Sequence, residues 1–266
     1  MSTPETILEG RQLRKEFGGL VAVADVSLSV ARSSLHSIIG PNGAGKTTLF
    51  NLITGRYAPT SGTVILKGQD ITALPPYRRA HLGLGRSYQI TNVFPNLTVL
   101  ENVRLAAQAM SKINFRFYRP ASSYREFVDK AMSILALIGL EREAGYLATT
   151  LPHGGKRKLE LAILLASNPD ILLLDEPTAG MASEQVPELI ATIDTVRRQG
   201  DKTIVMVEHN MSLVMGISDR ITVMHHGSVL AEGTPPEISA NATVQQAYLG
   251  ELYGDFSDVM AGGTHG

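Results

Sequence analysis

The amino-acid sequence predicts an α/β fold with an inserted helical subdomain, and three observations support this prediction. Two short, nearly pure apolar segments, Ile171–Leu174 and Thr203–Val207, are typical of parallel strands that are buried on both faces. A helix is expected between them at Glu184–Gln199, ended by Gly200, which gives a βαβ unit. The region from Asn102 to about Leu140 is rich in Ala, Met and Leu at helical spacing, which predicts the insertion.

The first hundred residues predict short strands separated by glycine turns. Alternating apolar positions, or a short apolar run, mark each strand, and a turn at Ser61-Gly62 is expected before the last one. A helix at Thr48–Thr54 is expected to end near Gly55. The predicted strands are Ile7–Leu13, Val21–Val30, Leu35–Ile39 and Thr63–Lys67.

The second half predicts further helices and one hairpin. The helical insertion is expected to break around Arg119-Pro120, and a helix at Lys156–Ala166 to stop at Asn168-Pro169. Strands at Ile221–Met224 and Ser228–Ala231, joined at His226-Gly227, are expected to form the hairpin. Beyond Gly250 we expect a flexible tail.

Composition excludes several classes of protein. The 266 residues are 44% apolar with a mean hydropathy of +0.05, enough for a real core. A net charge of −1 excludes binding of nucleic acid by bulk electrostatics. No cysteine is present, which excludes disulfides and thiolate chemistry. The longest segment without charged residues, Ser87–Leu100, is too short and too polar to span a bilayer, so we expect a soluble protein that reaches a membrane only through a partner.

Residues 40–48 match the phosphate-binding pattern G-x-x-x-x-G-K-[ST] in full. An apolar strand precedes them and a helix follows, and this context favours a nucleotide site over a simple glycine-rich turn. Lys46 is expected to reach the β- and γ-phosphates, and the hydroxyl of Thr47 is expected to coordinate Mg²⁺. The residues expected to cradle the phosphates are Gly40, Pro41, Asn42, Gly43, Ala44, Gly45, Lys46, Thr47 and Thr48.

A second element, the sequence Ile-Leu-Leu-Leu-Asp-Glu-Pro-Thr at residues 171–178, ends a predicted buried strand. Asp175 is expected at the Mg²⁺ site through water, and Glu176 is the candidate general base or water-orienting group. The alternative is a strand end capped by turn residues, and the accompanying phosphate loop disfavours it.

The order of these motifs resembles that of the ATP-binding-cassette (ABC) ATPases over the span Ile7–Ala231. The resemblance implies a P-loop NTPase (RecA-like) core with an N-terminal antiparallel β-subdomain. It also implies the domain boundaries: residues 1–89 and 162–250 for the nucleotide-binding core, 90–161 for the helical subdomain with the signature loop, and 251–266 for the tail.

The resemblance also implies further site residues. Phe17 matches the aromatic residue that stacks on adenine, although a half-buried strand-end Phe is the alternative. Gln89 matches the loop glutamine that touches Mg²⁺ and the attacking water, and His209 matches the switch histidine at the γ-phosphate. A surface glutamine and a structural histidine are the alternatives. The implied catalytic residues are thus Glu176, His209, Gln89 and Lys46, and the implied metal-site residues are Thr47, Gln89 and Asp175.

The segment from Leu151 to Arg157 occupies the place of the family's Leu-Ser-Gly-Gly-Gln signature, and it matches only in part. Gly154 fits and is expected to contact the nucleotide of the opposite subunit. Pro152 replaces the serine, and we expect the loss of this hydroxyl donor to weaken the composite site. Position 153 holds His and position 155 holds Gly, and His153, Lys156 and Arg157 are the candidates to replace the donor. Ala182 stands where the family has an Asp that communicates between subunits.

Five shorter segments, among them Phe17–Val23 and Phe94–Asn102, resemble the ATPase subunits of branched-chain amino-acid importers. The Phe-Gly-Gly-Leu sequence that begins at Phe17 and the long insertion from Arg104 to Lys130 resemble the larger of the two ATPase subunits. This implies ATP and Mg²⁺ as cofactors and a location on the inner face of the cell membrane. It implies as partners a second cassette in a nucleotide-sandwich dimer, transmembrane permease subunits and, indirectly, a substrate-binding protein. The alternatives are a urea or amide importer, a lipopolysaccharide or lipid exporter, a non-transport cassette and a module that binds ATP without hydrolysis. The solute, the identity of the partner cassette and the oligomeric state of the isolated chain stay open.

Overall fold

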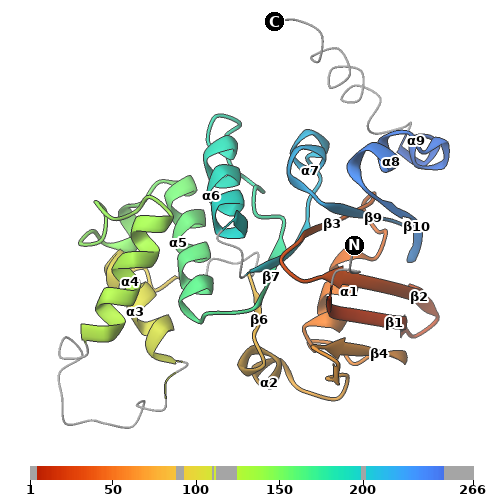
Figure 1. Ribbon diagram of the computed structural model, residues 1–266, viewed down its shortest axis with the longest axis horizontal. Helices are drawn as coiled ribbons and strands as arrows, with labels where there is room; N and C mark the ends of the chain where they lie inside the picture. The colour runs from red at the N-terminus through yellow and green to blue at the C-terminus, as the bar shows by residue number, and fades with distance from the viewer. Residues whose placement is uncertain (1–4, 88–92, 110, 112–124, 199–201, 249–266) are drawn as a thin grey trace, which may run out of the picture. The chain divides into compact units, whose positions relative to one another are not determined.

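The computed structural model describes residues 5–87, 93–109, 111, 125–198 and 202–248. The chain divides into two units (Figure 1), residues 1–79 with 203–266 and residues 80–202, and each unit is described by itself below. Among the described residues, every helix is too short or too polar to cross a bilayer.

The first unit begins with an antiparallel sheet in the strand order β2-β1-β4-β5 (Figure 1). Strand β2 alternates exposed and buried residues from Asp25 to Val30, as the apolar pattern predicted. The turn expected at Ser61-Gly62 is wrong, because both residues belong to β4. Gly62 has φ +89°, and a Cβ there would lie 2.3 Å from the carbonyl oxygen of Gln12, so the strand crosses its neighbour closely at this bulge. The strands are β1 (Thr6–Phe17), β2 (Leu20–Ala31), β4 (Ser61–Leu66) and β5 (Gln69–Asp70).

A second group of strands in the same unit follows the order β10-β9-β3-β8. Strands β9, β3 and β8 are parallel, and β10 pairs with β9 as the predicted hairpin. Every residue of β3 and β8 is buried, which confirms the prediction for apolar strands covered on both faces. The strands are β3 (Leu35–Ile39), β8 (Thr203–Val207), β9 (Arg220–His225) and β10 (Ser228–Gly233).

Short helices complete the first unit. Helix α1 begins and ends close to its predicted bounds. Helices α7, α8 and α9 were not predicted, because they are short and their sequences carry little hydrophobic periodicity. Polar caps define two of them: Asn210 accepts a hydrogen bond from the Leu213 N–H, and Thr234 forms a capping box with Glu237. The helices are α1 (Lys46–Ile53), α7 (Met211–Ile217), α8 (Pro235–Ser239) and α9 (Ala242–Tyr248); α2 (Pro76–His81) lies where the sequence passes into the second unit.

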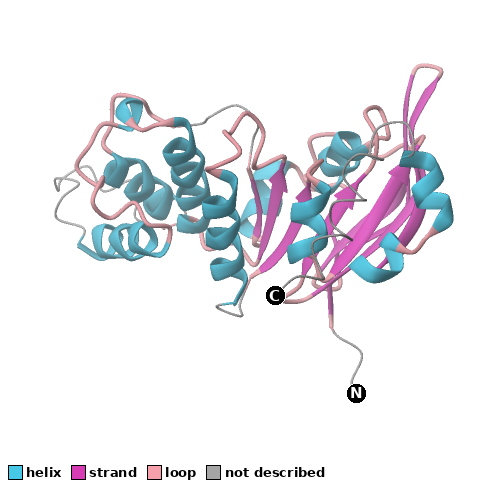
Figure 2. Ribbon diagram, turned by 90° about the horizontal axis from the view of Figure 1, so that it is seen from above, coloured by secondary structure: helices cyan, strands magenta, loops and turns pink. Residues whose placement is uncertain are grey.

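The second unit holds the parallel pair β6 (Leu84–Arg86) and β7 (Ile171–Asp175) and a set of packed helices. Helices α3, α4 and α5 contact one another and are among the cyan ribbons in Figure 2. The break expected at Arg119-Pro120 lies outside the described residues, as do Gly200 and the tail. The helices are α3 (Val99–Ala109), α4 (Arg125–Leu137), the short 3-10 turn η2 (Ala148–Thr150), α5 (His153–Ala166) and α6 (Val186–Arg198).

Helix α5 begins at His153, three residues before the predicted start at Lys156. Its N-cap is Pro152, which has an extended backbone and makes no side-chain cap hydrogen bond. The glycine pair of the signature segment therefore lies in the first helical turn. The predicted domain boundaries at residues 89, 161 and 250 stay a prediction.

Candidate functional site

The phosphate-binding loop connects β3 to α1 in the first unit. Gly45 has φ +98°, and a Cβ there would lie 2.4 Å from the carbonyl oxygen of Ala22, so only glycine fits. The carbonyl of Ala44 accepts a hydrogen bond of 3.1 Å from the N–H of Gly227, in the β9–β10 turn. Two other segments of the same unit, at Ala22 and at Gly227, therefore pack against the loop.

Lys46 opens helix α1 and is only 6% exposed. Its ammonium donates to the carbonyl oxygens of Gly40 at 2.6 Å and Pro41 at 3.0 Å. The first turn of the fully described α1 carries no acidic residue, so no carboxylate competes for the positive end of its macrodipole. A cation and a helix N-terminus in one loop are the physical requirements for binding phosphate.

Phe17 ends strand β1 and is 43% exposed. Its ring meets the ring of Tyr57 edge-on, with centroids 5.3 Å apart, and the ammonium of Lys15 lies 5.1 Å from its centroid. The exposed ring is available for stacking on a planar base, so the adenine role stays a prediction with a suitable geometry.

His209 lies two residues after the end of β8 and is exposed. The carboxylate of the buried Glu208 accepts a hydrogen bond of 3.1 Å from the His209 N–H, and Asn210 caps α7 on the other side. The backbone on both sides of the histidine is therefore fixed.

In the second unit, Asp175 ends β7 and is 4% exposed. Arg86 donates to Asp175 Oδ2 at 2.8 Å, and the backbone N–H of Asp175 donates to Ser87 Oγ at 3.1 Å. The other carboxylate oxygen, Oδ1, is buried and makes no hydrogen bond with any residue that the structure describes. The sequence analysis missed Arg86, because no spacing or motif links it to a residue 89 positions away.

Glu176 has φ +48°, a left-handed conformation that is uncommon for a residue other than glycine. Its carbonyl accepts a hydrogen bond of 3.0 Å from the Ala179 N–H, which closes a turn. Backbone strain of this kind costs on the order of 1–3 kcal/mol and occurs preferentially at functional sites. The strain lies at the residue that the sequence analysis selected as the general base.

The signature segment leads into the N-terminus of α5. Gly154 is buried, whereas His153 and Pro152 are exposed. Arg157 does not lie free beside the loop, as its role as a substitute donor requires. Its guanidinium donates to Glu160 at 2.9 Å and to the carbonyl of Ala179 at 3.2 Å.

The chemistry of two predicted ligands, each taken by itself, suits a magnesium ion. The Thr47 hydroxyl and the Asp175 carboxylate offer oxygen atoms, which Mg²⁺ prefers, and Asp175 Oδ1 has lone pairs that no hydrogen bond from the described residues uses. Within the described part of the chain no three His, Asp or Glu side chains form a metal cluster. A Mg²⁺ that binds one or two protein groups together with substrate phosphates does not require such a cluster.

The predicted site residues fall into two sets. Phe17, Lys46, Thr47 and His209 belong to the first unit, and Asp175, Glu176 and Gly154 to the second. Gln89 lies outside the described residues. A buried strand, a phosphate loop with its lysine, and a second buried strand that ends in Asp-Glu together define a P-loop nucleoside triphosphatase.

Comparisons with known proteins identify the family. The family model described as "ABC transporter" matches residues 23–179, and the model "Branched-chain amino acid ATP-binding cassette transporter" matches residues 228–253. The chain belongs to the ABC transporter family, as one of its ATP-binding cassettes. The resemblance on which the sequence analysis relied is thereby confirmed.

Two relatives are named as high-affinity branched-chain amino acid transport ATP-binding proteins. LivG of Escherichia coli (strain K12) is 42% identical over 256 residues, which cover 94% of this chain and 100% of the relative. BraF of Pseudomonas aeruginosa is also 42% identical, with the same coverage.

The fold agrees with solved cassettes. The ADP conformation of MJ1267, an ATP-binding cassette of an ABC transporter, matches with a TM-score of 0.82 at 31% identity, covering 93% of this chain and all of that one. A post-hydrolysis dimer of the cassette MJ0796, bound to ADP and Pi, matches with a TM-score of 0.73 at 27% identity and covers 86% of this chain and 99% of that one. The predicted α/β cassette fold is confirmed.

Proposed function

We propose that this chain binds and hydrolyses ATP as a subunit of an ABC importer for branched-chain amino acids or closely related small metabolites. The main support for ATP binding and hydrolysis is the phosphate loop. In this loop Gly45 has a conformation that only glycine tolerates, and the ammonium of Lys46 is hydrogen-bonded to the loop's own backbone. The solute follows from the relatives, which match over their full length and carry that transport function in their names.

Each residue has a proposed task in the reaction. Lys46 binds the β- and γ-phosphates, and Phe17 stacks on the adenine. Glu176 orients the attacking water and accepts its proton, and His209 and Gln89 contact the γ-phosphate and the water. Thr47, Asp175 and Gln89 hold Mg²⁺, which when bound neutralises charge on the phosphates.

The assembly is also part of the proposal. One chain offers one phosphate loop and one signature segment, so two cassettes have to close around two nucleotides, with Gly154 at the partner's nucleotide. A dimeric cassette structure is among the matched structures. The pair would act on transmembrane permease subunits at the inner face of the cell membrane and serve, indirectly, a substrate-binding protein.

The test replaces the general base. Glu176→Gln is expected to lower the ATPase rate of the assembled complex by about 10²–10⁴-fold while ATP binding is retained, because the amide cannot accept the proton. The matched control is Glu184→Gln. Glu184 is an exposed carboxylate a few residues after Glu176 in the sequence, and its replacement should leave the rate unchanged. Full turnover of Glu176→Gln would refute this assignment, and absence of ATP binding by the unaltered chain would refute the whole proposal.

A second experiment distinguishes between the candidate classes of transported solute. The membrane proteins that co-purify with the tagged chain should include permease subunits and a substrate-binding protein, and vesicles that hold the complex should accumulate labelled leucine, isoleucine or valine. Uptake of urea or amides alone would favour that importer class. Co-purification without any binding protein would favour a lipid or lipopolysaccharide exporter.

The signature segment has its own test. Pro152→Ser restores the hydroxyl donor at the N-cap of α5 and is expected to raise turnover of the assembled complex, because loss of one such donor costs roughly 10²–10³-fold at comparable sites. Unchanged turnover would show that the composite site does not depend on that hydroxyl.

A further inference from the structure

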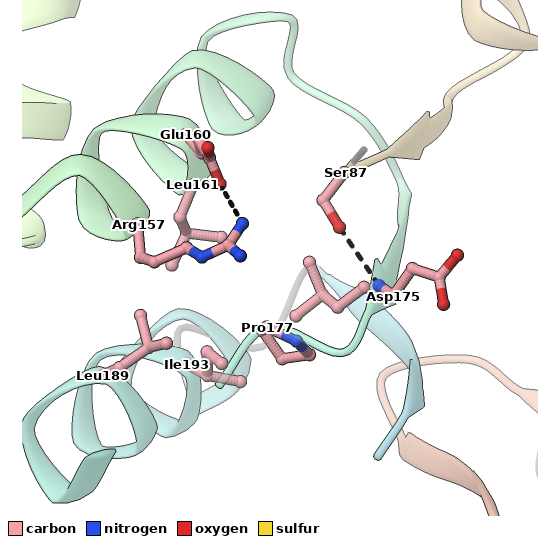
Figure 3. Close-up of a pocket in the computed structure, with 9 residues that line it drawn as sticks. Ser87, Arg157, Glu160, Leu161, Asp175, Pro177, Leu189 and Ile193 are labelled. Carbon is pink, nitrogen blue, oxygen red and sulfur yellow. Dashed lines mark hydrogen bonds and ion pairs between the residues drawn. The ribbon is translucent and has the colours of Figure 1, made fainter. Parts of the chain in front are cut away.

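The ion pair between Arg157 and Glu160 lies in an unusual place for two neighbours on one helix. The N···O distance is 2.9 Å, and the two side chains are only 15% and 13% exposed. They line a small cavity whose wall is otherwise largely apolar (Figure 3), with Leu161, Leu189 and Ile193 around them. Burying both charges costs free energy that a hydrophobic pair would not cost, so the ion pair is weak evidence for a stabilising role.

The guanidinium reaches beyond its own helix. Arg157 Nη2 donates to the carbonyl oxygen of Ala179 at 3.2 Å, 22 positions along the chain. Ala179 is the residue whose N–H closes the turn onto the carbonyl of Glu176. One side chain of α5 is therefore bonded to the turn that holds Glu176 in its left-handed conformation.

The cavity beside the ion pair measures about 20 Å³, which is enough for a single water molecule. Two buried atoms of the pair, Arg157 Nε and Glu160 Oε1, make no hydrogen bond within the described residues. One is a donor and the other an acceptor, so a single water can serve both.

We propose that Arg157 is a positioning residue for Glu176, with Glu160 orienting its guanidinium. A strained backbone conformation persists only where its surroundings hold it, and the Arg157–Ala179 hydrogen bond is a contact that does so. Arg157 also lies one helical turn after Gly154, at the end of α5 that carries the signature segment. This inference rests on the proposed function, in which that segment contacts the partner's nucleotide while Glu176 acts on the other one. The same side chain then makes the catalytic turn of one site depend on the helix that serves the second site.

The test uses the complex purified from membranes through a tag on this chain. In Arg157→Lys the charge remains, but one ammonium cannot reproduce the planar fork that serves Glu160 and Ala179 together. We expect kcat to fall roughly ten- to a hundredfold, because small displacements of a catalytic group have effects of this size, while KM and the affinity for ATP stay unchanged. Glu160→Ala should lower kcat in the same selective way but less, and Glu160→Gln should restore it, since the amide oxygen still accepts from the guanidinium.

The matched control is Arg197→Lys on α6. Arg197 also pairs three positions back on its own helix, with Asp194 at 3.0 Å, and the two side chains are 23% and 22% exposed. Arg197→Lys should keep full activity. Unchanged kcat in Arg157→Lys would overturn the proposal, and so would a loss that KM, ATP affinity and melting temperature share, since that is the result of a merely structural role. Should Arg157→Lys fail to fold, the contrast between Glu160→Ala and Glu160→Gln decides the question alone. Absence of ATP hydrolysis by the unaltered complex would refute the proposed function instead.

Discussion

Arg79 offers the sharpest test of what holds the C-terminal end of α1 in place. It is 1% exposed, and its guanidinium donates to four backbone carbonyls: Leu74 at 2.9 Å, Leu52 at 2.8 Å, Ile53 at 2.6 Å and Thr72 at 2.8 Å. Two of these carbonyls lie at the C-terminal end of α1, where no further helical turn can satisfy them. Burial lowers the pKa of Arg79 to about 10, with the nearby Asp70 acting in the opposite direction, so the side chain stays charged at neutral pH.

The perturbation is Arg79→Met, which keeps the length of the side chain and removes every donor. Each buried carbonyl left without a partner costs about 1–3 kcal/mol. The Leu52 carbonyl keeps a hydrogen bond of 3.2 Å from the Gly55 N–H, so three of the four carbonyls lose their partner. These three give roughly 3–9 kcal/mol if water does not enter, and partial hydration places the expected loss at about 4–5 kcal/mol. Because a whole domain is stable by only about 5–15 kcal/mol, the variant should be close to unfolding.

The assay is urea unfolding followed by circular dichroism, with Arg78→Met as the control. Arg78 is exposed and adjacent, so its replacement should change the free energy of unfolding by less than about 0.5 kcal/mol. Arg79→Lys should fall between the two, since an ammonium has three donors and no fork. If Arg79→Met were as stable as the unaltered chain, the buried carbonyls would have other means of satisfaction, and the account of α1 given above would be wrong.

Three further predictions concern other elements. His36 is buried and bonded to Thr222 Oγ1 at 2.7 Å, and desolvation, with a smaller effect of Arg220, lowers its pKa to about 4. Because the unfolded imidazole binds a proton below about pH 6.5 and the folded one only below about 4, stability should fall as the pH drops through this window, by about 1.4 kcal/mol per unit, and His36→Gln should abolish that slope in denaturation curves. Gly45→Ala should abolish ATP binding in calorimetry, since its Cβ would lie 2.4 Å from a backbone oxygen, and binding of normal affinity would contradict the loop geometry. Asn102→Leu should destabilise the second unit by about 2–3 kcal/mol in urea unfolding, because its carboxamide bonds both the N–H and the carbonyl of Phe94 and the carbonyl of Thr98, and an unchanged midpoint would refute this.

The sequence predicted those parts of the fold that depend on local pattern. Strands β3 and β8 begin and end at their predicted bounds, because a strand buried on both faces is mostly apolar, and the buried His36 of β3 is hydrogen-bonded to Thr222. The phosphate loop was predictable for a related reason, since its glycines and lysine are adjacent in the sequence. The turn expected at Ser61-Gly62 was wrong, because the glycine that predicted it instead permits a bulge and a close strand crossing. The predicted start of α5 was three residues too late, because the glycine pair disfavours a helix. The helix nevertheless begins directly after its N-cap, Pro152.

Contacts between distant residues could not be predicted in this way. The ion pair Arg86–Asp175 and the hydrogen bond from the Arg157 side chain to the Ala179 carbonyl join residues that no periodicity relates. The sequence marked Asp175 and Glu176 through a motif, but it gave no sign that an arginine accompanies each of them. The left-handed backbone of Glu176 was equally hidden, because glutamate carries no propensity for it.

These hidden contacts share one physical feature, which bears on how a nucleotide would bind. The ammonium of Lys46 is held by carbonyl oxygens of its own loop, and Asp175 is held by Arg86. These two groups, to which the proposed function assigns phosphate and metal, are therefore already oriented by oxygen or nitrogen atoms of this chain. Binding of ATP would exchange these partners for phosphate and metal rather than order free side chains, which reduces the entropy cost of binding. The same contacts keep charged groups satisfied within buried surroundings, where an unpaired charge would be far more costly than the exchange.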